Sequence, residues 1–325
     1  MDYTKEIDYS SLDTYLTCPR KFMFRYMMHL SRTGAPSLDL VFGSCWHYGM
    51  ELAMQELQKD SGLSAPQLTE IAQSAFLTLW EVEAAPYFDP DASFPKNPGR
   101  AHDMFYAFFS EHLTTFREAR ILGIESPFMI HLKEGFPTYI GRLDLVLLLP
   151  DGSLEVIDWK TAKFANDTTF SGYEVSLQTD GYLTAGNLYF DKLPKITYWV
   201  ALCQKTKIDF YPHTIRRGIA QIDRFLSDLM AHSSAILRDR YIFLEELEHQ
   251  ARDPYPKTYN PPCFRRKPGY ACTIYFRRCE YFDICMMRNN PLEWATRPPQ
   301  GYEILEWHPA NVSAEARLGK EKGDV

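Results

Sequence analysis

The sequence lacks several features that mark common classes of protein. It has no apolar run approaching the roughly 20 residues needed to cross a bilayer, and its first residues are too polar and acidic for a signal peptide. It has no phosphate-binding loop of the form GxxxxGK[ST], so any helicase motor must be a separate chain. We therefore expect a cytoplasmic protein that does not act at a membrane.

Positive charge is scarce as well. The 325 residues carry a formal net charge of −7, which argues against a protein that coats nucleic acid by bulk charge. Basic residues instead gather in short clusters, such as Arg20, Lys21 and Arg25. An acidic chain with local basic patches is compatible with an enzyme that must release nucleic acid after acting on it.

Close C-x2-C pairs, which are typical of zinc ribbons, are missing although the chain has seven cysteines. Two of them, Cys45 and Cys203, lie among apolar residues and are expected in the core. Four others follow residue 262, within a Pro-rich segment that has little periodicity. In a reducing compartment such a group of thiols favours metal binding over disulfides.

What is present is typical of a globular α/β protein: 45% of the residues are hydrophobic and 14% are aromatic. The periodicity predicts, in order, helices over 9–30, 41–59 and 65–123 with a loop at 86–98, strands over 128–132, 139–149 and 154–161, a helix over 173–190, strands over 196–202 and 208–213, and a helix over 215–248. This order describes a mixed sheet with helices on its faces. The polar tail from about Pro309 is expected to be disordered.

A strand pair near the middle of the chain is the most informative feature. Two apolar runs flank Asp151-Gly152, which is a hairpin signal. The hairpin would place Asp144 beside Asp158, and Lys160 would share a face with Asp158 because strand side chains alternate. Two carboxylates and an amine at one point can hold a divalent metal and a water beside a phosphodiester. An exposed, salt-bridged strand is the alternative interpretation.

Several further motifs stand around this strand pair in a fixed order. They are Tyr9-Ser10-Ser11-Leu12 with Cys18-Pro19-Arg20-Lys21-Phe22, Gly43-Ser44-Cys45-Trp46-His47, Gly141-Arg142-Leu143-Asp144, Asp158-Trp159-Lys160, Gln178-Thr179-Asp180-Gly181-Tyr182, and the C-terminal cysteines. Together they resemble the PD-(D/E)xK nuclease superfamily, in particular its RecB-type branch with an iron–sulfur cluster. That branch includes AddB-like, CRISPR adaptation and phage exonucleases. Leu143 departs from the pattern, since it stands at the position of the name-giving proline.

The resemblance implies a restriction-endonuclease-like mixed sheet flanked by helices, with a helical insertion and a C-terminal Cys-rich segment that binds the cluster. The corresponding segments are 1–60 for the N-terminal helices of the nuclease core, 61–125 for the helical insertion, 126–250 for the nuclease core, 251–290 for the iron–sulfur segment and 291–325 for the tail.

The resemblance also implies the residues of a catalytic metal site. The metal ligands would be His47, Asp144, Asp158 and the backbone carbonyl of Trp159, a set that suits Mg²⁺ or Mn²⁺. Lys160 would orient the attacking water and offset charge that develops on phosphorus. Three residues would assist: Glu51 would support the ligands, and Gln178 and Tyr182, four apart on one helical face, would contact DNA or position the carboxylates. An ordinary helix surface is the alternative for the last two.

Four thiolates would hold a [4Fe–4S] cluster, by the same resemblance. They are Cys18, Cys272, Cys279 and Cys285, and the spacing leaves Cys263 as an alternative to Cys272. Such a cluster would tie residue 18 to residues beyond 270. We expect a structural role for it rather than redox catalysis.

The expected function is metal-dependent cleavage of DNA, by an exonuclease or endonuclease that acts on single strands or ends. The process would be recombination, repair, or phage or CRISPR-associated DNA processing, with a separate helicase, recombinase or CRISPR adaptation protein as a partner. Two alternatives remain: a catalytically silent DNA-binding subunit of a larger complex, and a zinc-stabilised hydrolase with a non-nucleic substrate. The sequence leaves polarity, oligomeric state and DNA versus RNA preference open.

Overall fold

A computed structural model of the chain describes residues 6–256, 259–273, 278–286 and 290–305. The chain divides into two compact units. Unit 1 comprises residues 1–34, 130–140 and 226–309, and unit 2 comprises residues 35–129, 141–225 and 310–325. The tail predicted to begin near Pro309 lies outside the described residues. Within the described ranges, no helix is both long enough and apolar enough to cross a membrane.

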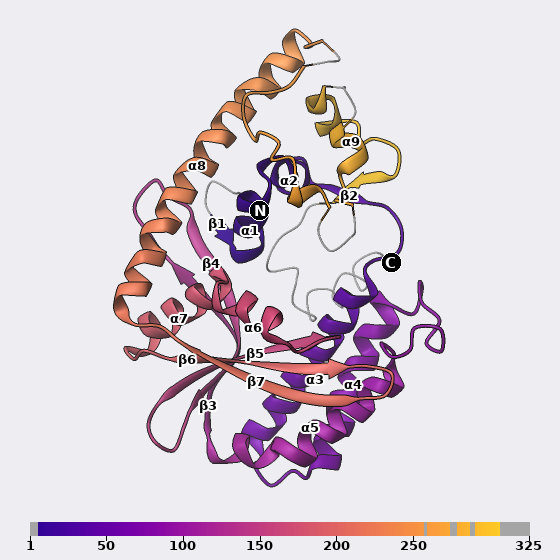
Figure 1. The fold of residues 1–325 in the computed structure, drawn as a ribbon, viewed down its shortest axis with the longest axis vertical. Coiled ribbons are helices and arrows are strands. Elements are labelled where there is room, and N and C mark those ends of the chain that lie inside the picture. Colours follow the sequence, from indigo (N-terminus) through magenta and orange to yellow (C-terminus); the bar gives the residue numbers. More distant parts are fainter. Residues whose placement is uncertain (1–5, 257–258, 274–277, 287–289, 306–325) are drawn as a thin grey trace. The chain divides into compact units, whose positions relative to one another are not determined.

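Groups of helices and groups of strands follow one another along the chain (Figure 1). They are α1 (Tyr9–Thr17), α2 (Pro19–Phe22), a π-helical turn (Met23–Met27), α3 (Leu38–Lys59), α4 (Ala65–Glu83), α5 (Pro98–Glu118), α6 (Asp167–Glu174), α7 (Leu177–Phe190), α8 (Ile219–Arg252) and α9 (Phe282–Met286), with short 3₁₀ turns at Tyr270–Cys272 and Pro291–Ala295.

The strands form one mixed sheet and a small two-stranded one. They are β1 (Glu6–Asp8), β2 (Leu30–Arg32), β3 (Arg120–Ile130), β4 (Thr138–Leu148), β5 (Leu154–Ala162), β6 (Lys195–Cys203), β7 (Ile208–Arg216) and β8 (Tyr302–Ile304). The main sheet has the order β1-β4-β5-β6-β7, and β3 also pairs with β4. The β4–β5 and β6–β7 pairs are antiparallel, whereas β5–β6 and β1–β4 are parallel. The mixed sheet flanked by helices that the sequence predicts is therefore confirmed.

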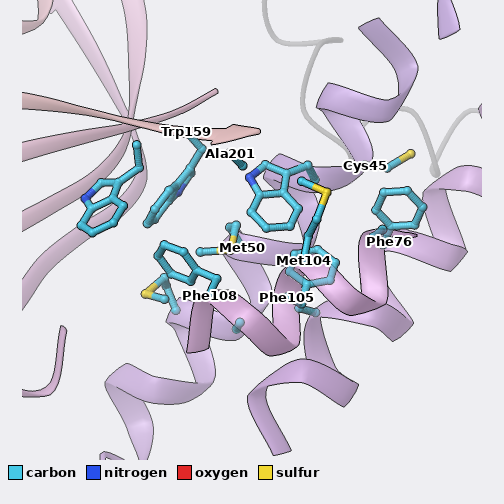
Figure 2. Close-up of a cluster of buried hydrophobic side chains, with 14 of the residues drawn as sticks. Cys45, Met50, Phe76, Met104, Phe105, Phe108, Trp159 and Ala201 are labelled. Atoms are coloured by element: carbon cyan, nitrogen blue, oxygen red, sulfur yellow. The ribbon is translucent and has the colours of Figure 1, made fainter. Parts of the chain in front are cut away.

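The core of unit 2 lies between the sheet and helices α3, α4 and α5. Apolar residues recur every three or four positions along α3, so one face of this helix is buried. Trp46 of α3 stacks on Phe105 of α5, with ring centroids 4.3 Å apart. Figure 2 shows Trp159 of β5 pointing toward Phe108 of the same helix, and the two rings meet edge to face at 5.6 Å. The segment predicted as a helical insertion thus supplies two of the three helices that cover this face.

Alternation along β5 separates the core from the opposite face of the sheet. Ile157 and Trp159 belong to the hydrophobic cluster, so Asp158 and Lys160 point the other way. There Asp158 is paired across the ladder with Tyr198 of β6, and the Tyr198 ring stacks on Tyr173 of α6 at 4.4 Å. The polar residues of β5 therefore lie against a wall of aromatic rings.

Unit 1 joins segments from the two ends of the sequence. The Asp8 carboxylate accepts hydrogen bonds from the backbone N–H groups of Ser10 and Ser11 and so caps α1. The buried Arg20 guanidinium donates to the Phe264 carbonyl and to the Asn260 side chain, each at 2.9 Å. Strand β8, in the segment predicted as a tail, pairs with β2. Side-chain and backbone bonds thus hold the N-terminal helices to the C-terminal segment.

Three predicted elements differ in extent. The helix expected over 9–30 restarts at Pro19, as a proline at this position predicts, because Cys18 is extended; what the sequence did not predict is that its last part is the π-helical turn Met23–Met27. The helix expected over 173–190 is two helices, since Ser176 caps α7 through a 3.2 Å bond from the Gln178 N–H. Strand β3 begins at Arg120, inside a segment predicted to be helical, because pairing with β4 outweighs local propensity there.

Candidate metal-dependent active site

The β4–β5 hairpin brings the two predicted carboxylates together. The ladder pairs run from Leu148 with Leu154 to Leu145 with Ile157, so Asp144 and Asp158 stand at the next opposed positions. The Asp144 carboxylate accepts a 3.0 Å hydrogen bond from the Trp159 backbone N–H. Both aspartates are buried, and Asp158 is only 1% exposed. The Asp151-Gly152 turn signal therefore locates this site correctly.

Helix α3 supplies the predicted histidine. The His47 Nδ1 lies 3.1 Å from the Asp144 Oδ2. Burial alone would lower the pKa of His47, but the Asp144 carboxylate outweighs that effect and raises it. Burial would in turn raise the pKa of Asp144, yet His47, Lys160 and the Trp159 N–H together lower it. The pair is thus mutually stabilised in its charged form.

The predicted lysine lies against the second carboxylate. The Lys160 Nζ is 2.5 Å from the Asp158 Oδ2, and it sits 5.7 Å from the centre of the Tyr198 ring. The Lys160 ammonium contacts only Oδ2, whereas the buried Oδ1 has no hydrogen-bond partner among the described residues. Burial and the nearby Asp144 raise the pKa of Asp158 to about 6, although Lys160 opposes the shift. A buried carboxylate oxygen without a partner is costly unless a further cation binds it.

Glu125 of β3 is a site residue that the sequence analysis missed. Its carboxylate, the His47 ring and the Asp144 carboxylate bring one ligand atom each within 4.8 Å of one another. The Glu125 backbone has a φ of +46°, a left-handed conformation that glutamate rarely adopts. Its side chain forms an ion pair with Arg142, while burial and Asp144 raise its pKa to about 8.

The sequence held only a weak signal for Glu125. It is an acid in a short stretch of apolar residues, directly before Ser126-Pro127. The left-handed turn that aims its side chain at the site is set by the sheet rather than by local residue type. Arg142, part of a motif noted in the sequence, also had no assigned role.

The three predicted assisting residues also lie at this site. Gln178 Nε2 donates a 3.1 Å hydrogen bond to the Tyr182 hydroxyl. Burial, followed by the charges of Asp144 and Asp158, raises the Tyr182 pKa well above its usual range, so the phenol stays neutral. Glu51 accepts a hydrogen bond from Gln55, and its charge contributes to the raised pKa of Glu125. All the residues predicted for the metal site therefore meet in unit 2.

An open cavity of about 350 Å³ lies over this group. It is lined by Asp39, Leu40, Gly43, Ser44, His47, Tyr48, Glu51, Glu125, Arg142, Trp159, Lys160 and Thr161. The lining combines potential metal ligands with two cations, Arg142 and Lys160. Such a cavity has the charge pattern needed to receive a metal ion together with a phosphate group.

The four predicted cluster ligands all belong to unit 1. The Cys279 N–H donates a 2.9 Å hydrogen bond to the Cys272 carbonyl. The charge of Cys18 acts on both Cys279 and Cys285, and that of Cys272 acts on Cys285. Burial raises the pKa of Cys285 to about 11, and the Arg20 guanidinium opposes this shift.

Cys263, the alternative ligand, has different surroundings. It is fully buried, and burial together with the charge of Asp239 raises its pKa to about 12. Cys272 is part-exposed and joined to Cys279 through the backbone. Cys263 nevertheless lies near the same arginine as Cys18 and Cys285, since all three thiols interact with the Arg20 guanidinium.

Comparison with known proteins agrees with this geometry. The family model of the PD-(D/E)XK nuclease superfamily matches residues 7–286. The chain belongs to this superfamily. A search of the curated proteins found no match.

Two solved structures illustrate the range of similarity. One is a protein from Eubacterium rectale provisionally described as an exonuclease, with 13% identity, a TM-score of 0.44, and coverage of 73% of this chain and 81% of that one. The other, SSO0001, has 15% identity, a TM-score of 0.30, and coverage of 70% and 76%. Both likenesses are too weak to bear on the function of this chain.

Proposed function

We propose that the protein is a metal-dependent deoxyribonuclease, most simply an exonuclease acting on single strands or DNA ends. The convergence of His47, Asp144, Asp158 and Lys160 at one cavity carries the proposal. A nuclease superfamily supplies the reaction class, which is hydrolysis of a phosphodiester. Recombination, repair, and phage or CRISPR-associated processing are the settings that suit such an enzyme.

The residues present fit a divalent metal. Asp158 is a buried carboxylate whose Oδ1 has no hydrogen-bond partner among the described residues, and His47 with Asp144 adds nitrogen and oxygen donors. Asp144, Asp158, His47 and the Trp159 carbonyl would hold Mg²⁺ or Mn²⁺, with Glu125 as a further acidic donor. When bound, the metal supplies Lewis-acid polarisation of the phosphate and a more acidic water.

The chain's own side chains orient the attacking water, offset charge and position the carboxylates. The Lys160 ammonium, held by Asp158, orients the attacking water and offsets charge on the phosphate oxygens. Arg142, at the wall of the cavity, provides a second cation for the DNA backbone. The neutral Tyr182 phenol, fixed by Gln178, positions the carboxylates without adding charge.

We further propose that Cys18, Cys272, Cys279 and Cys285 hold a [4Fe–4S] cluster. Their mutual electrostatic contacts and the backbone bond between Cys272 and Cys279 support this set. The raised pKa values of Cys279 and Cys285 disfavour free thiolates at these two residues, whereas iron binds cysteines in the deprotonated form. A cluster there would link α1 and α2 to the C-terminal segment within unit 1.

The direct test is cleavage of end-labelled single- and double-stranded DNA by anaerobically purified protein, with Mn²⁺, Mg²⁺ or EDTA. The Asp158→Ala variant is assayed beside an Asp151→Ala control, because Asp151 lies on the exposed turn of the same hairpin. We expect metal-dependent cleavage that only Asp158→Ala abolishes. Tight DNA binding with no cleavage by the wild type would instead indicate a silent binding subunit.

A further inference from the structure

Two exposed phenylalanines on unit 2 each have a cation against the ring. Phe164 is 57% exposed and Phe94 is 42% exposed. The Lys163 Nζ lies 5.4 Å from the centre of the Phe164 ring, and the Arg100 guanidinium carbon lies 5.9 Å from that of Phe94. Each ring thus pairs with one positive charge and keeps much of its surface in solvent.

Gln204, in the turn between β6 and β7, joins these two pairs. Its side-chain Nε2 donates a 2.7 Å hydrogen bond to the Lys163 carbonyl. Its own carbonyl accepts a hydrogen bond from the Arg100 guanidinium. The two ring–cation pairs are therefore neighbours on a single surface, which we call the rim: Phe94, Arg100, Lys163 and Phe164.

The rim is continuous with the mouth of the active-site cavity. The Cys203 thiol contacts the carbonyl of Pro95, and the next residue, Gln204, is hydrogen-bonded to Arg100, so Lys96 and Arg100 lie close to one another beside the end of β6. Lys96 forms a 2.9 Å ion pair with Asp39, which lines the cavity next to the 72% exposed Leu40. A strand leaving the cavity past Asp39 and Leu40 would therefore meet the rim.

The cations of the rim differ from two nearby lysines in having no ion-pair partner among the described residues. Lys96 is paired with Asp39, and Lys207 is paired with Asp209. Within the described part of the chain, no carboxylate forms an ion pair with Arg100, Lys163 or Lys205. Cations of this kind beside the cavity can contact the phosphates of a polyanion, although the whole chain has a net charge of −7.

We propose that the rim binds single-stranded DNA beside the scissile phosphate, an inference that rests on the proposed nuclease function. Unpaired bases would stack on Phe94 and Phe164, while Arg100 and Lys163 contact the adjoining phosphates. Inside a duplex, neighbouring bases cover both faces of each base. Stacking on a protein ring therefore requires bases that lie outside a duplex. The rim thus selects single strands or frayed ends as substrate.

Binding is measured by fluorescence anisotropy of a labelled oligothymidylate in EDTA, so that cleavage does not interfere. Phe164→Ala is expected to weaken binding roughly tenfold, the usual effect of losing one stacking ring. Lys163→Ala is expected to reduce the steepness of the plot of log binding constant against log salt concentration by about 0.7. This is the value expected for the loss of one phosphate contact on a single strand. Matched controls are Tyr106→Ala, an equally exposed aromatic on α5, and Lys192→Ala, an exposed lysine that follows α7.

The same variants are assayed with bis(p-nitrophenyl) phosphate and Mn²⁺, a diester too small to reach the rim. We expect wild-type turnover of this diester, with loss confined to DNA binding. Unchanged oligothymidylate binding, or an equal loss for duplex DNA, would overturn the rim proposal. Failure of the wild type to cleave either substrate would overturn the nuclease proposal, while the binding assay in EDTA would still decide the role of the rim.

Discussion

Glu125 occupies a backbone conformation that a non-glycine residue maintains only when the surrounding fold enforces it. Its left-handed φ costs about 1–3 kcal/mol, yet it turns a carboxylate toward His47 and Asp144. Strain of this kind is concentrated at functional sites. Glu125 therefore belongs with the metal donors rather than with the ion pairs of the protein surface.

Replacing Glu125 by glutamine keeps the side-chain volume and removes the charge. We expect Glu125→Gln to raise the Mn²⁺ concentration for half-maximal DNA cleavage about 10- to 100-fold, as for other groups that support metal ligands. The measurement is a Mn²⁺ titration of cleavage, with Glu118→Gln at the end of α5 as the control. Equal Mn²⁺ requirements for the two variants would assign Glu125 to the Arg142 ion pair alone.

Cys203 gives a prediction about alkaline stability. Burial raises the pKa of its thiol from 9.0 to about 11, although Lys96 and Arg100 act in the opposite direction. Below pH 9 the thiol is neutral in both states, so its contribution to folding is fully present. Between pH 9 and pH 11 the unfolded chain loses this proton first, and the contribution, at most about 3 kcal/mol, is lost.

Cys203→Ser removes the titration and retains a donor for the Pro95 carbonyl, which the thiol contacts at 3.3 Å. We expect urea unfolding of the wild type to lose free energy more steeply with pH over this interval than unfolding of the variant. Parallel pH profiles would show that the thiol does not stay protonated in the folded state.

At the scale of elements, strand β4 passes under an aromatic side chain of β3. A Cβ atom at Gly141 would overlap the ring of Phe128, and that ring packs edge to face on Tyr182 at 6.0 Å. Gly141 thus permits the close approach that seats Tyr182 near the two aspartates. The glycine of the Gly141–Asp144 motif has a steric role distinct from that of the acid.

Gly141→Ala is expected to destabilise the protein by about 1–3 kcal/mol, because Phe128 must leave its position. DNA cleavage should fall with it, since Tyr182 loses its support. Gly172→Ala in α6 is the control, as nothing lies within 4 Å of the added carbon there. The measurement is thermal unfolding of the Gly141→Ala and Gly172→Ala variants. Equal melting temperatures would show that the Phe128 ring moves aside with no loss of folding free energy.

Local signals account for most of what the sequence predicted. Asp151-Gly152 fixed the hairpin, and alternation assigned Asp158 and Lys160 to one face because both effects act within a few residues. Helix α3 followed from its periodic apolar face. Glu125 and the start of β3 could not be predicted this way, because pairing with β4, a tertiary effect, decides both.

Motif resemblance supplied the parts of the site that no local rule provides. Spacing alone does not reveal that His47, about a hundred residues before Asp144, contacts its carboxylate. Spacing alone also gives no reason to propose Cys18 as a cluster ligand, because it lies more than 250 residues before Cys272. The rim was not anticipated either, because Phe94 and Phe164 become neighbours only through Gln204.

At the scale of the whole molecule, the proposed cluster would add to aromatic contacts that already join the two ends of the chain within unit 1, such as Phe22 with Phe264 and Phe24 with Tyr281. If Cys18 is a cluster ligand, the Cys18→Ser variant should contain much less iron and sulfide than the wild type and should unfold at a lower temperature. Cys203→Ser is the control, because that thiol lies in β6 of the other unit. Iron and sulfide analysis of both proteins, purified anaerobically, tests this expectation; full iron content in Cys18→Ser would remove Cys18 from the ligand set.

A second pair of variants decides between the two candidate cysteines. Cys272→Ser is expected to lower the iron content, whereas Cys263→Ser should retain it and lose stability only through altered packing. The reverse result would make Cys263 the ligand and would require the backbone around Cys272 to be rearranged.

The alternation along β5 has a consequence for how genes of this kind can change in length. An extra codon at the Asp151-Gly152 turn only enlarges an exposed loop, where Gly152 already has a positive φ. An extra codon between Glu155 and Ile157 would move each later side chain of β5 to the opposite face of the sheet. Asp158 would then face the hydrophobic core, and the Trp159 ring would face the side of the sheet that carries the two aspartates. Among related genes, insertions and deletions should therefore be found at the Asp151-Gly152 turn, and selection should remove them from β5. The position where length variation stops would then mark the start of this strand.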